Sequence, residues 1–126
     1  HLFDHIAIPE ANIHRMRGEA DPAAEAERYA AEIEQFLRKA NGQPSFDIVY
    51  LGMGTDGHTA SIFPHNIELL HVPELCAVAT HPQSGQLRVT LTGNAINNAQ
   101  KVIFLVTGAS KAEKIGEIFG KKGGYL

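Results

Sequence analysis

The residues of this chain best suited to chemistry lie in one stretch, "GMGTDGHTASIFP" (52–64). Three of them are glycines, Gly52, Gly54 and Gly57. Glycines let a backbone approach a ligand closely and point its N–H groups at an anion or a developing oxyanion. Histidine has an unperturbed pKa near neutrality, so His58 can act as a general base. Asp56 can orient that imidazole or handle a proton itself. The stretch therefore predicts acid–base chemistry on a bound ligand.

The first part of this stretch, residues 52–58, is called the glycine loop below. It directly follows "FDIVYL" (46–51), a short apolar run typical of a strand covered on both faces. In parallel α/β sheets, binding sites form beyond the carboxyl ends of strands, so the loop is well placed for a site. A simpler interpretation is a tight strand-to-helix connection, in which Asp56 caps a short helix "HTASIF" (58–63). The loop matches neither a Walker loop nor a dinucleotide fingerprint.

The elements that must position the loop alternate between helix and strand patterns. A helix is expected to begin at Asp21-Pro22 and to end at Asn41-Gly42, and a last helix to begin near Ser110. Three further strands are expected, at 75–80, 86–92 and 101–106. This alternation predicts a single α/β domain over residues 1–126, with a mostly parallel sheet flanked by helices.

Composition narrows the class of protein. The 126 residues are 44 % hydrophobic and 20 % charged, with a net charge of −3, which gives no reason to expect nucleic acid or a membrane as partner. No apolar run is long enough to span a membrane. The one cysteine, Cys76, predicts a reducing compartment, and hence a soluble cytoplasmic protein.

Several other residues have a functional and a structural interpretation. Cys76 lies in the apolar stretch "LCAVA", where an inert core thiol is the expected role and a nucleophile the alternative. Three histidines, His65, His71 and His81, show no metal-ligand spacing, so we interpret them as surface or loop residues and expect no metal site.

The string "GMGTDGHTASIFP" closely resembles the signature of the 6-phosphogluconolactonase family, a strand followed by G-M-G-x-D-G-H-T-A-S-L-F-P. The departures, Thr55 and Ile62, are conservative. "IPEANIHRM", the acidic-alanine helix after "DP" and "RVTLTGNAINNAQKVIFLVTGASKAEKI" follow that family in order and spacing, so the resemblance covers essentially the whole chain. It implies the fold of the sugar-phosphate isomerases and lactonases, and hydrolysis of 6-phosphogluconolactone without metal or cofactor.

Carried over by position, the resemblance makes His58 the base that activates water for attack on the lactone carbonyl, assisted by Asp56. The glycines are expected to line the substrate site, with the amides of Gly54 and Gly57 near the developing oxyanion. Lys111 matches a lysine that related sugar-phosphate enzymes use on the phosphate, and an exposed helix lysine is its alternative. Arg88 matches an arginine of the family, and a surface ion pair is its alternative.

One departure from the family is large. Its earlier segment, with an S-G-G-S-T-type phosphate loop, does not occur in this sequence, and neither does its usual C-terminal end. The chain resembles the middle and later part of a lactonase domain, and both ends look like cuts through a larger protein. We therefore expect an incomplete fold, an incomplete phosphate pocket and little lactone hydrolysis by these residues alone.

Two other functions stay open at this point. Glucosamine-6-phosphate deaminase also carries D-G-H in a glycine-rich loop, but it continues I-A-F-N-E-P and supplies a glutamate that "TASIFP" lacks. A non-catalytic sugar-phosphate sensor, such as the effector domain of a regulator, is the other. No helix-turn-helix or basic segment accompanies this chain. The sequence leaves the oligomeric state open.

Overall fold

The computed structural model describes residues 3–120. Its helices and strands in chain order are α1 (Pro22–Phe36), β1 (Lys39–Ala40), β2 (Gln43–Pro44), β3 (Val49–Leu51), β4 (Cys76–Thr80), β5 (Leu87–Leu91), α2 (Gly93–Asn97), β6 (Val102–Phe104) and α3 (Ala112–Gly120). Four 3-10 helices complete the set, η1 (Phe3–His5), η2 (Glu10–Asn12), η3 (Pro64–Leu70) and η4 (Ala109–Lys111). The outermost residues of the suspected cuts, 1–2 and 121–126, lie outside the described part.

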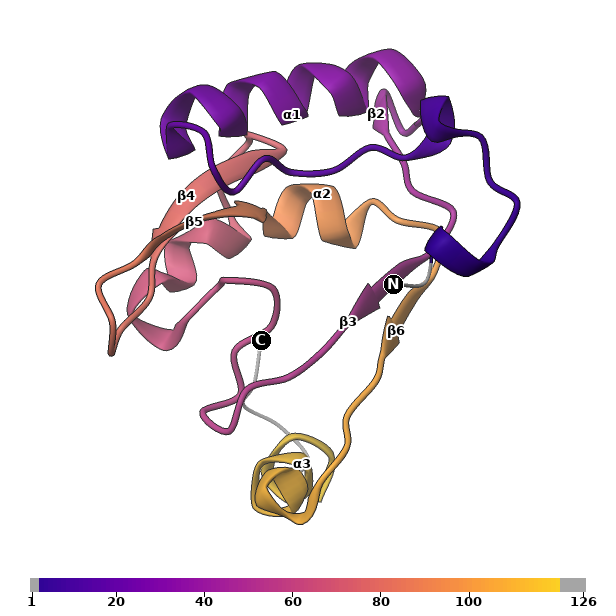
Figure 1. The fold of residues 1–126 in the computed structure, drawn as a ribbon. Helices are drawn as coiled ribbons and strands as arrows, with labels where there is room; N and C mark the ends of the chain where they lie inside the picture. The colour runs from indigo at the N-terminus through magenta and orange to yellow at the C-terminus, as the bar shows by residue number, and fades with distance from the viewer. Residues whose placement is uncertain (1–2, 121–126) are drawn as a thin grey trace.

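The strands of the described part form three pairs. β3 and β6 are parallel, with Val49 opposite Val102, and they lie side by side in Figure 1. β4 and β5 are antiparallel, with Cys76 opposite Leu91. The predicted α/β class is confirmed, and the parallel arrangement holds for β3 and β6. β4 and β5 differ because only residues 81–86 join them, whereas parallel neighbours need a crossover of a dozen residues or more.

The helix α1 begins where the sequence predicts and ends earlier. Asp21 Oδ1 accepts a hydrogen bond from the Ala24 N–H at 3.0 Å, which caps the helix. The helix stops at Phe36, so the predicted end at Asn41-Gly42 is wrong. Asn41 and Gly42 instead turn the β1–β2 hairpin with φ of 55° and 80°, because Asn-Gly suits a turn that needs two positive φ angles.

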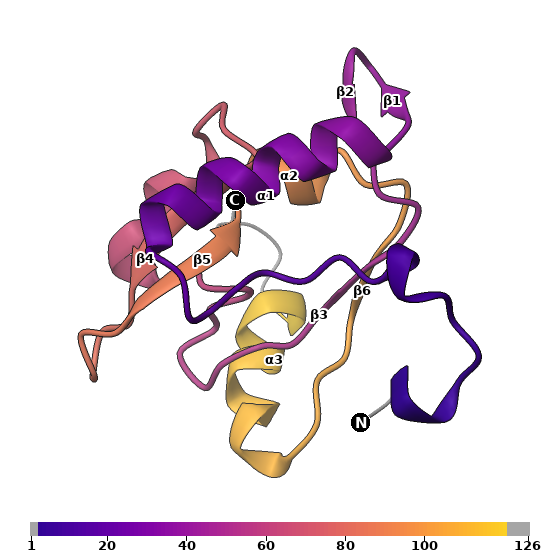
Figure 2. The ribbon, with the colours of Figure 1, turned by 45° about the horizontal axis from the view of Figure 1, so that its top comes forward.

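Two clusters of buried side chains hold these elements together. α1 lies across β4 and β5 (Figures 1 and 2), and Ala26 and Ile33 of α1 pack with Cys76 there. The second cluster includes β3 and the segment that follows the glycine loop, and its largest fully buried side chain is Phe63. The glycine loop is therefore anchored to the core on both sides, by β3 before it and by Phe63 after it.

The outer face of the β3–β6 pair is open in the described part. Val49 and Leu51 face the core, whereas Tyr50 between them is 61 % exposed. Ile48 and Leu105 are also exposed. The apolar sequence of both strands predicts that other elements pack on both faces of the pair. Within residues 3–120, other elements pack on one face only.

Close packing of α2 against η3 gives a first prediction, on stability. A methyl group at Gly93 would overlap the Leu70 carbonyl oxygen and lie 2.6 Å from Leu70 Cα. Gly93→Ala should therefore lower the free energy of unfolding by about 1–3 kcal/mol, as overpacking does. Gly116→Ala is the control, because nothing lies within 4 Å of that site on α3. Denaturant unfolding measures both, and equal stability of the two variants would contradict the close approach.

Candidate active site

The glycine loop leaves the carboxyl end of β3 and closes on itself. The Gly54 N–H donates to the His58 carbonyl at 2.8 Å, and the Gly57 N–H donates to the Gly54 carbonyl at 3.1 Å. The Thr59 hydroxyl donates to the Gly52 carbonyl at 3.0 Å and ties the two ends of the loop together. Gly57 has a φ of +90°, a conformation that glycine adopts at little cost.

This closure contradicts one expectation about the loop amides. Gly54 and Gly57 both donate their N–H groups to carbonyls within the loop, so neither amide is free to stabilise an oxyanion in this conformation. Gly57 serves the loop by allowing the tight turn, since it alone of the three glycines has a positive φ. Gly52 and Gly54 still line the cavity described below.

The interpretation of Asp56 as the cap of a helix over 58–63 is also wrong. These residues make a turn closed by a bridge between Thr59 and Ile62, and the next helix, η3, begins at Pro64. Ala60 lies in the left-handed region with a φ of 50°, which no α-helix contains. The turn directs the chain from His58 back into the core.

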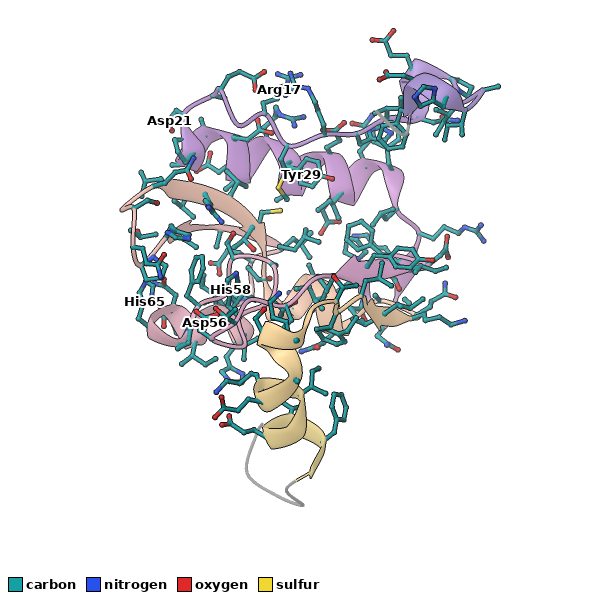
Figure 3. All side chains as sticks on the ribbon, turned by 60° about the horizontal axis from the view of Figure 1, so that its bottom comes forward. Arg17, Asp21, Tyr29, Asp56, His58 and His65 are labelled. Atoms are coloured by element: carbon teal, nitrogen blue, oxygen red, sulfur yellow. The ribbon has the colours of Figure 1, made fainter. Side chains whose placement is uncertain are left out.

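His58 and Asp56 form a hydrogen-bonded pair at the loop tip (Figure 3). The His58 Nδ1 lies 2.6 Å from Asp56 Oδ1, and the His58 backbone N–H donates to the same oxygen at 3.1 Å. Burial raises the pKa of Asp56, but these hydrogen bonds together outweigh it and hold that pKa below its usual value. An ionised carboxylate only accepts, so Nδ1 carries the proton. In the neutral ring, Nε2 is then free to accept a proton.

The His58 side chain, 24 % exposed, borders a cavity of about 340 Å³. The other lining residues are Tyr50, Leu51, Gly52, Met53, Gly54 and Ala60. The volume is at the lower end of the range for small-molecule sites. A base with a free Nε2 therefore borders a space of the size that one small ligand needs.

Lys111, from the far end of the chain, contacts Met53, one of the residues that line this cavity. It closes η4, and its Nζ donates to the Met53 carbonyl at 2.6 Å. This contact rules out the alternative of an exposed helix lysine. An ammonium has three N–H groups, so two remain for a ligand beside the loop.

Arg88 lies in a different cavity. It is half-buried on β5, and its guanidinium lies 3.4 Å from Gln86 Oε1. Within residues 3–120 no carboxylate forms an ion pair with Arg88, so the alternative of a surface ion pair is not seen there. Its cavity of about 250 Å³ is also lined by Arg17 and Ser61, and Figure 3 shows Arg17 well away from His58.

Cys76 is an inert core thiol, as expected. It is buried, and burial raises its pKa to about 11, so the nucleophilic thiolate is scarce at neutral pH. His65 and His71 are exposed, and His81 caps a turn by accepting hydrogen bonds from the backbone of Gln83 and Ser84.

Across residues 3–120, no group of three or more His, Cys, Asp or Glu side chains is arranged to hold a metal ion. No helix in that part of the chain is both long and apolar enough to cross a membrane.

Sequence reasoning missed three residues that shape the site. Phe63 lies against the His58 ring, Thr59 closes the loop, and Met53 supplies the carbonyl that Lys111 binds. All three lie inside the motif "GMGTDGHTASIFP", but their roles depend on a turn that the periodicity of the sequence does not predict. The one sequence signal is the apolar Phe63 before Pro64, which is typical of a residue that packs in the core.

The fold and the loop define an α/β protein with a histidine–aspartate pair at the carboxyl end of a parallel strand. Comparison with known proteins is more specific. The chain belongs to the family described as glucosamine-6-phosphate isomerases/6-phosphogluconolactonase, whose sequence profile matches residues 1–124. The resemblance inferred from the motif is confirmed.

Relatives at substantial identity support this membership. The 6-phosphogluconolactonases of Treponema pallidum and Haemophilus influenzae are 46 % and 47 % identical over 117 residues, which is 93 % of this chain and 48 % of each relative. The crystal structure of the devB protein superposes with a TM-score of 0.90 at 44 % identity, covering 95 % of this chain and 50 % of that one. The Thermotoga maritima 6-phosphogluconolactonase gives 0.79 at 32 %, covering 94 % and 51 %. The chain thus spans about half the length of these relatives.

Proposed function

We propose that this chain carries the catalytic loop of a 6-phosphogluconolactonase, which hydrolyses 6-phospho-D-glucono-1,5-lactone to 6-phosphogluconate in the oxidative pentose phosphate pathway. The observation that carries the proposal is the 2.6 Å contact between His58 Nδ1 and Asp56 beside the cavity. The names of the relatives support the same activity. The reaction is a hydrolysis that needs no metal or cofactor, and its partner is a small sugar-phosphate lactone in the cytoplasm.

The geometry suits His58 as the general base. Its Nε2 takes a proton from water while the water oxygen bonds to the lactone carbonyl carbon. The bond from that carbon to the ring oxygen then breaks, and the imidazolium returns the proton to the departing oxygen. Asp56 keeps Nδ1 protonated and stabilises the imidazolium, a division of labour common to histidine–carboxylate pairs.

Two cations are candidates for the substrate phosphate. Lys111 already points its ammonium at the loop, where two N–H groups remain for an anion. Arg88 has no carboxylate partner in the described part, which leaves its guanidinium available. Arg88 lines a separate cavity, whereas Lys111 contacts Met53 beside His58, so Lys111 is the stronger candidate for a ligand that also touches His58.

The family description covers isomerases as well as lactonases, so membership does not choose between them. The stretch from Thr59 to Phe63 contains no carboxylate, and this favours the lactonase over a deaminase that relies on a glutamate there. A sensor domain would bind a sugar phosphate and leave it unchanged. The paired His58 and Asp56 favour turnover over sensing.

The test uses a chimera in which the Treponema pallidum enzyme supplies the half of the fold that this chain does not span. In it, this chain replaces the matched 117-residue segment of that enzyme, and we call the product the lactonase chimera. It should hydrolyse 6-phosphogluconolactone above the spontaneous background. The 126 residues alone should do little, because the phosphate contacts would be incomplete. A folded chimera that releases ammonia from glucosamine 6-phosphate, or that binds the lactone without opening it, would contradict the proposal.

Lys111→Ala in the lactonase chimera should act on binding more than on chemistry. A phosphate contact remote from the carbonyl contributes nearly equally to the ground state and the transition state. KM should rise by roughly 10-fold or more, the size of a lost charge-assisted hydrogen bond, while kcat falls less. Lys101→Ala, which removes one exposed lysine at the start of β6, is the control and should change neither constant. An unchanged KM with a collapsed kcat would place Lys111 at the reacting carbon.

A further inference from the structure

We infer that Phe63 is a positioning residue for His58. Its buried ring holds the imidazole in the orientation in which Nδ1 bonds Asp56 and Nε2 is left for the ligand. The inference rests on the proposed function for its catalytic meaning. The contact itself can be tested without turnover.

The contact with Asp56 alone does not fix the orientation of the His58 ring. One hydrogen bond fixes the distance between Nδ1 and Oδ1, which is 2.6 Å here, but coupled changes of χ1 and χ2 can still tilt the imidazole while that bond is kept. Asp56 is 41 % exposed and His58 is 24 % exposed, so water competes for the bond and leaves room for motion. A general base must hold its free nitrogen within hydrogen-bond reach of the proton that it takes. A second contact on the face of the ring is therefore needed.

Phe63 provides that contact. The centroids of the His58 and Phe63 rings are 4.5 Å apart with an interplanar angle of 51°, a tilted arrangement within the favourable range for aromatic pairs. The hydrogen bond to Asp56 holds one edge of the imidazole, and Phe63 limits its rotation. Together they define both the position and the plane of the ring.

Phe63 can do this because it cannot move. Its side chain is fully buried in the cluster that contains Val49 and Leu51 of β3. Its ring is also in contact with two further imidazoles, His65 stacked at 5.7 Å and His81 edge-on at 5.3 Å. The wall that faces His58 is therefore part of the packed core.

The local backbone explains how a residue five positions later comes to lie against His58. Ala60 in the left-handed region and the bridge from Thr59 to Ile62 reverse the chain directly after His58. Pro64 then starts η3 and fixes the direction in which the chain leaves. A non-glycine residue with positive φ costs free energy, and such strain concentrates at functional sites. Here the strained turn is what places the buried ring behind the base.

Packing and positioning can be separated by one substitution. Phe63→Leu keeps an apolar side chain in the core but removes the flat face. Phe46→Leu is the matched control, because Phe46 packs against the same cluster, while within residues 3–120 the His58 ring is paired with Phe63 and not with Phe46. Both variants should lose some stability, and only Phe63→Leu should disturb the imidazole.

The readout on the 126-residue chain is the tautomer of His58, measured by the nitrogen shifts of its ring in NMR spectra. The wild-type chain and Phe46→Leu should show the Nδ1–H form. In Phe63→Leu the Nε2–H form should rise roughly two- to tenfold, the range expected from loss of an aromatic contact. A folded Phe63→Leu chain with the wild-type tautomer population would overturn the inference.

If Phe63→Leu does not fold, the wild-type chain still decides the matter. Nuclear Overhauser contacts between the His58 and Phe63 rings, together with a single tautomer, are expected. Their absence, or a mixture of tautomers, would overturn the inference.

In the lactonase chimera, Phe63→Leu should also lower kcat by about tenfold or more with KM nearly unchanged, because small misplacements of a catalytic group are costly. A chimera with no activity at all would refute the proposed function and leave the NMR result standing.

Discussion

His58→Ala in the lactonase chimera should lower kcat by about 100-fold or more and leave KM nearly unchanged. The reason is that His58 offers Nε2 as an acceptor at the cavity, while Asp56 holds its other nitrogen. Removing the imidazole removes the base and leaves the cavity and the nearby Lys111 in place. The measurement is initial-rate hydrolysis of 6-phosphogluconolactone, corrected for the spontaneous opening of the lactone.

The matched control is His71→Ala, an exposed histidine that does not line the His58 cavity. It should have wild-type kcat and KM. A His58→Ala chimera with wild-type kcat would remove His58 from the mechanism. Equal losses in both variants would indicate a general effect on folding.

The sequence predicts elements well where the local signal is unambiguous. Asp21 and Pro22 fix the start of α1, because an N-cap carboxylate and a proline at the first helical position both favour that one boundary. The order of strand, glycine loop and later helix is likewise readable from apolar runs broken by glycine. That order is sufficient to place His58 beyond the carboxyl end of β3.

Prediction fails where one local signal serves two structures. Asn41-Gly42 can follow a helix or turn a hairpin, and the choice depends on whether Lys39 can pair with Pro44. Similarly, apolar runs such as 75–80 and 86–92 carry no mark of strand direction, and their antiparallel pairing follows from the length of the connection.

For the candidate site, the sequence suggests residues more readily than it suggests their contacts. Asp56 and His58 are two positions apart, so their hydrogen bond is a local property that the sequence can suggest. The bonds that occupy the Gly54 and Gly57 amides depend on the backbone angles of the whole loop. The contact of Lys111 with Met53 joins residues 58 positions apart, and only the fold can bring them together.

Gly54→Ala should be nearly as damaging as the loss of His58 itself, although residue 54 carries no chemistry. A methyl group there would overlap the Cε1 and Nδ1 atoms of His58 and lie 2.6 Å from Asp56 Oδ1. The hydrogen bond between those two side chains is only 2.6 Å long, so the pair cannot keep its geometry beside the methyl group. A displacement of about 1 Å at a catalytic group can cost about 100-fold in rate, and we expect a fall in kcat of that order.

Gly52→Ala is the control from the same loop, because nothing lies within 4 Å of a methyl group at that position. Because Gly52 lines the cavity, the two variants are compared by the state of the His58–Asp56 pair and not by kcat. In NMR spectra, Gly54→Ala should lose the hydrogen-bonded Nδ1–H signal of His58, and Gly52→Ala should keep it. Full activity of Gly54→Ala with that signal intact would show that the loop accommodates the methyl group by moving elsewhere. The close fit between the glycine and the pair would then be no part of catalysis.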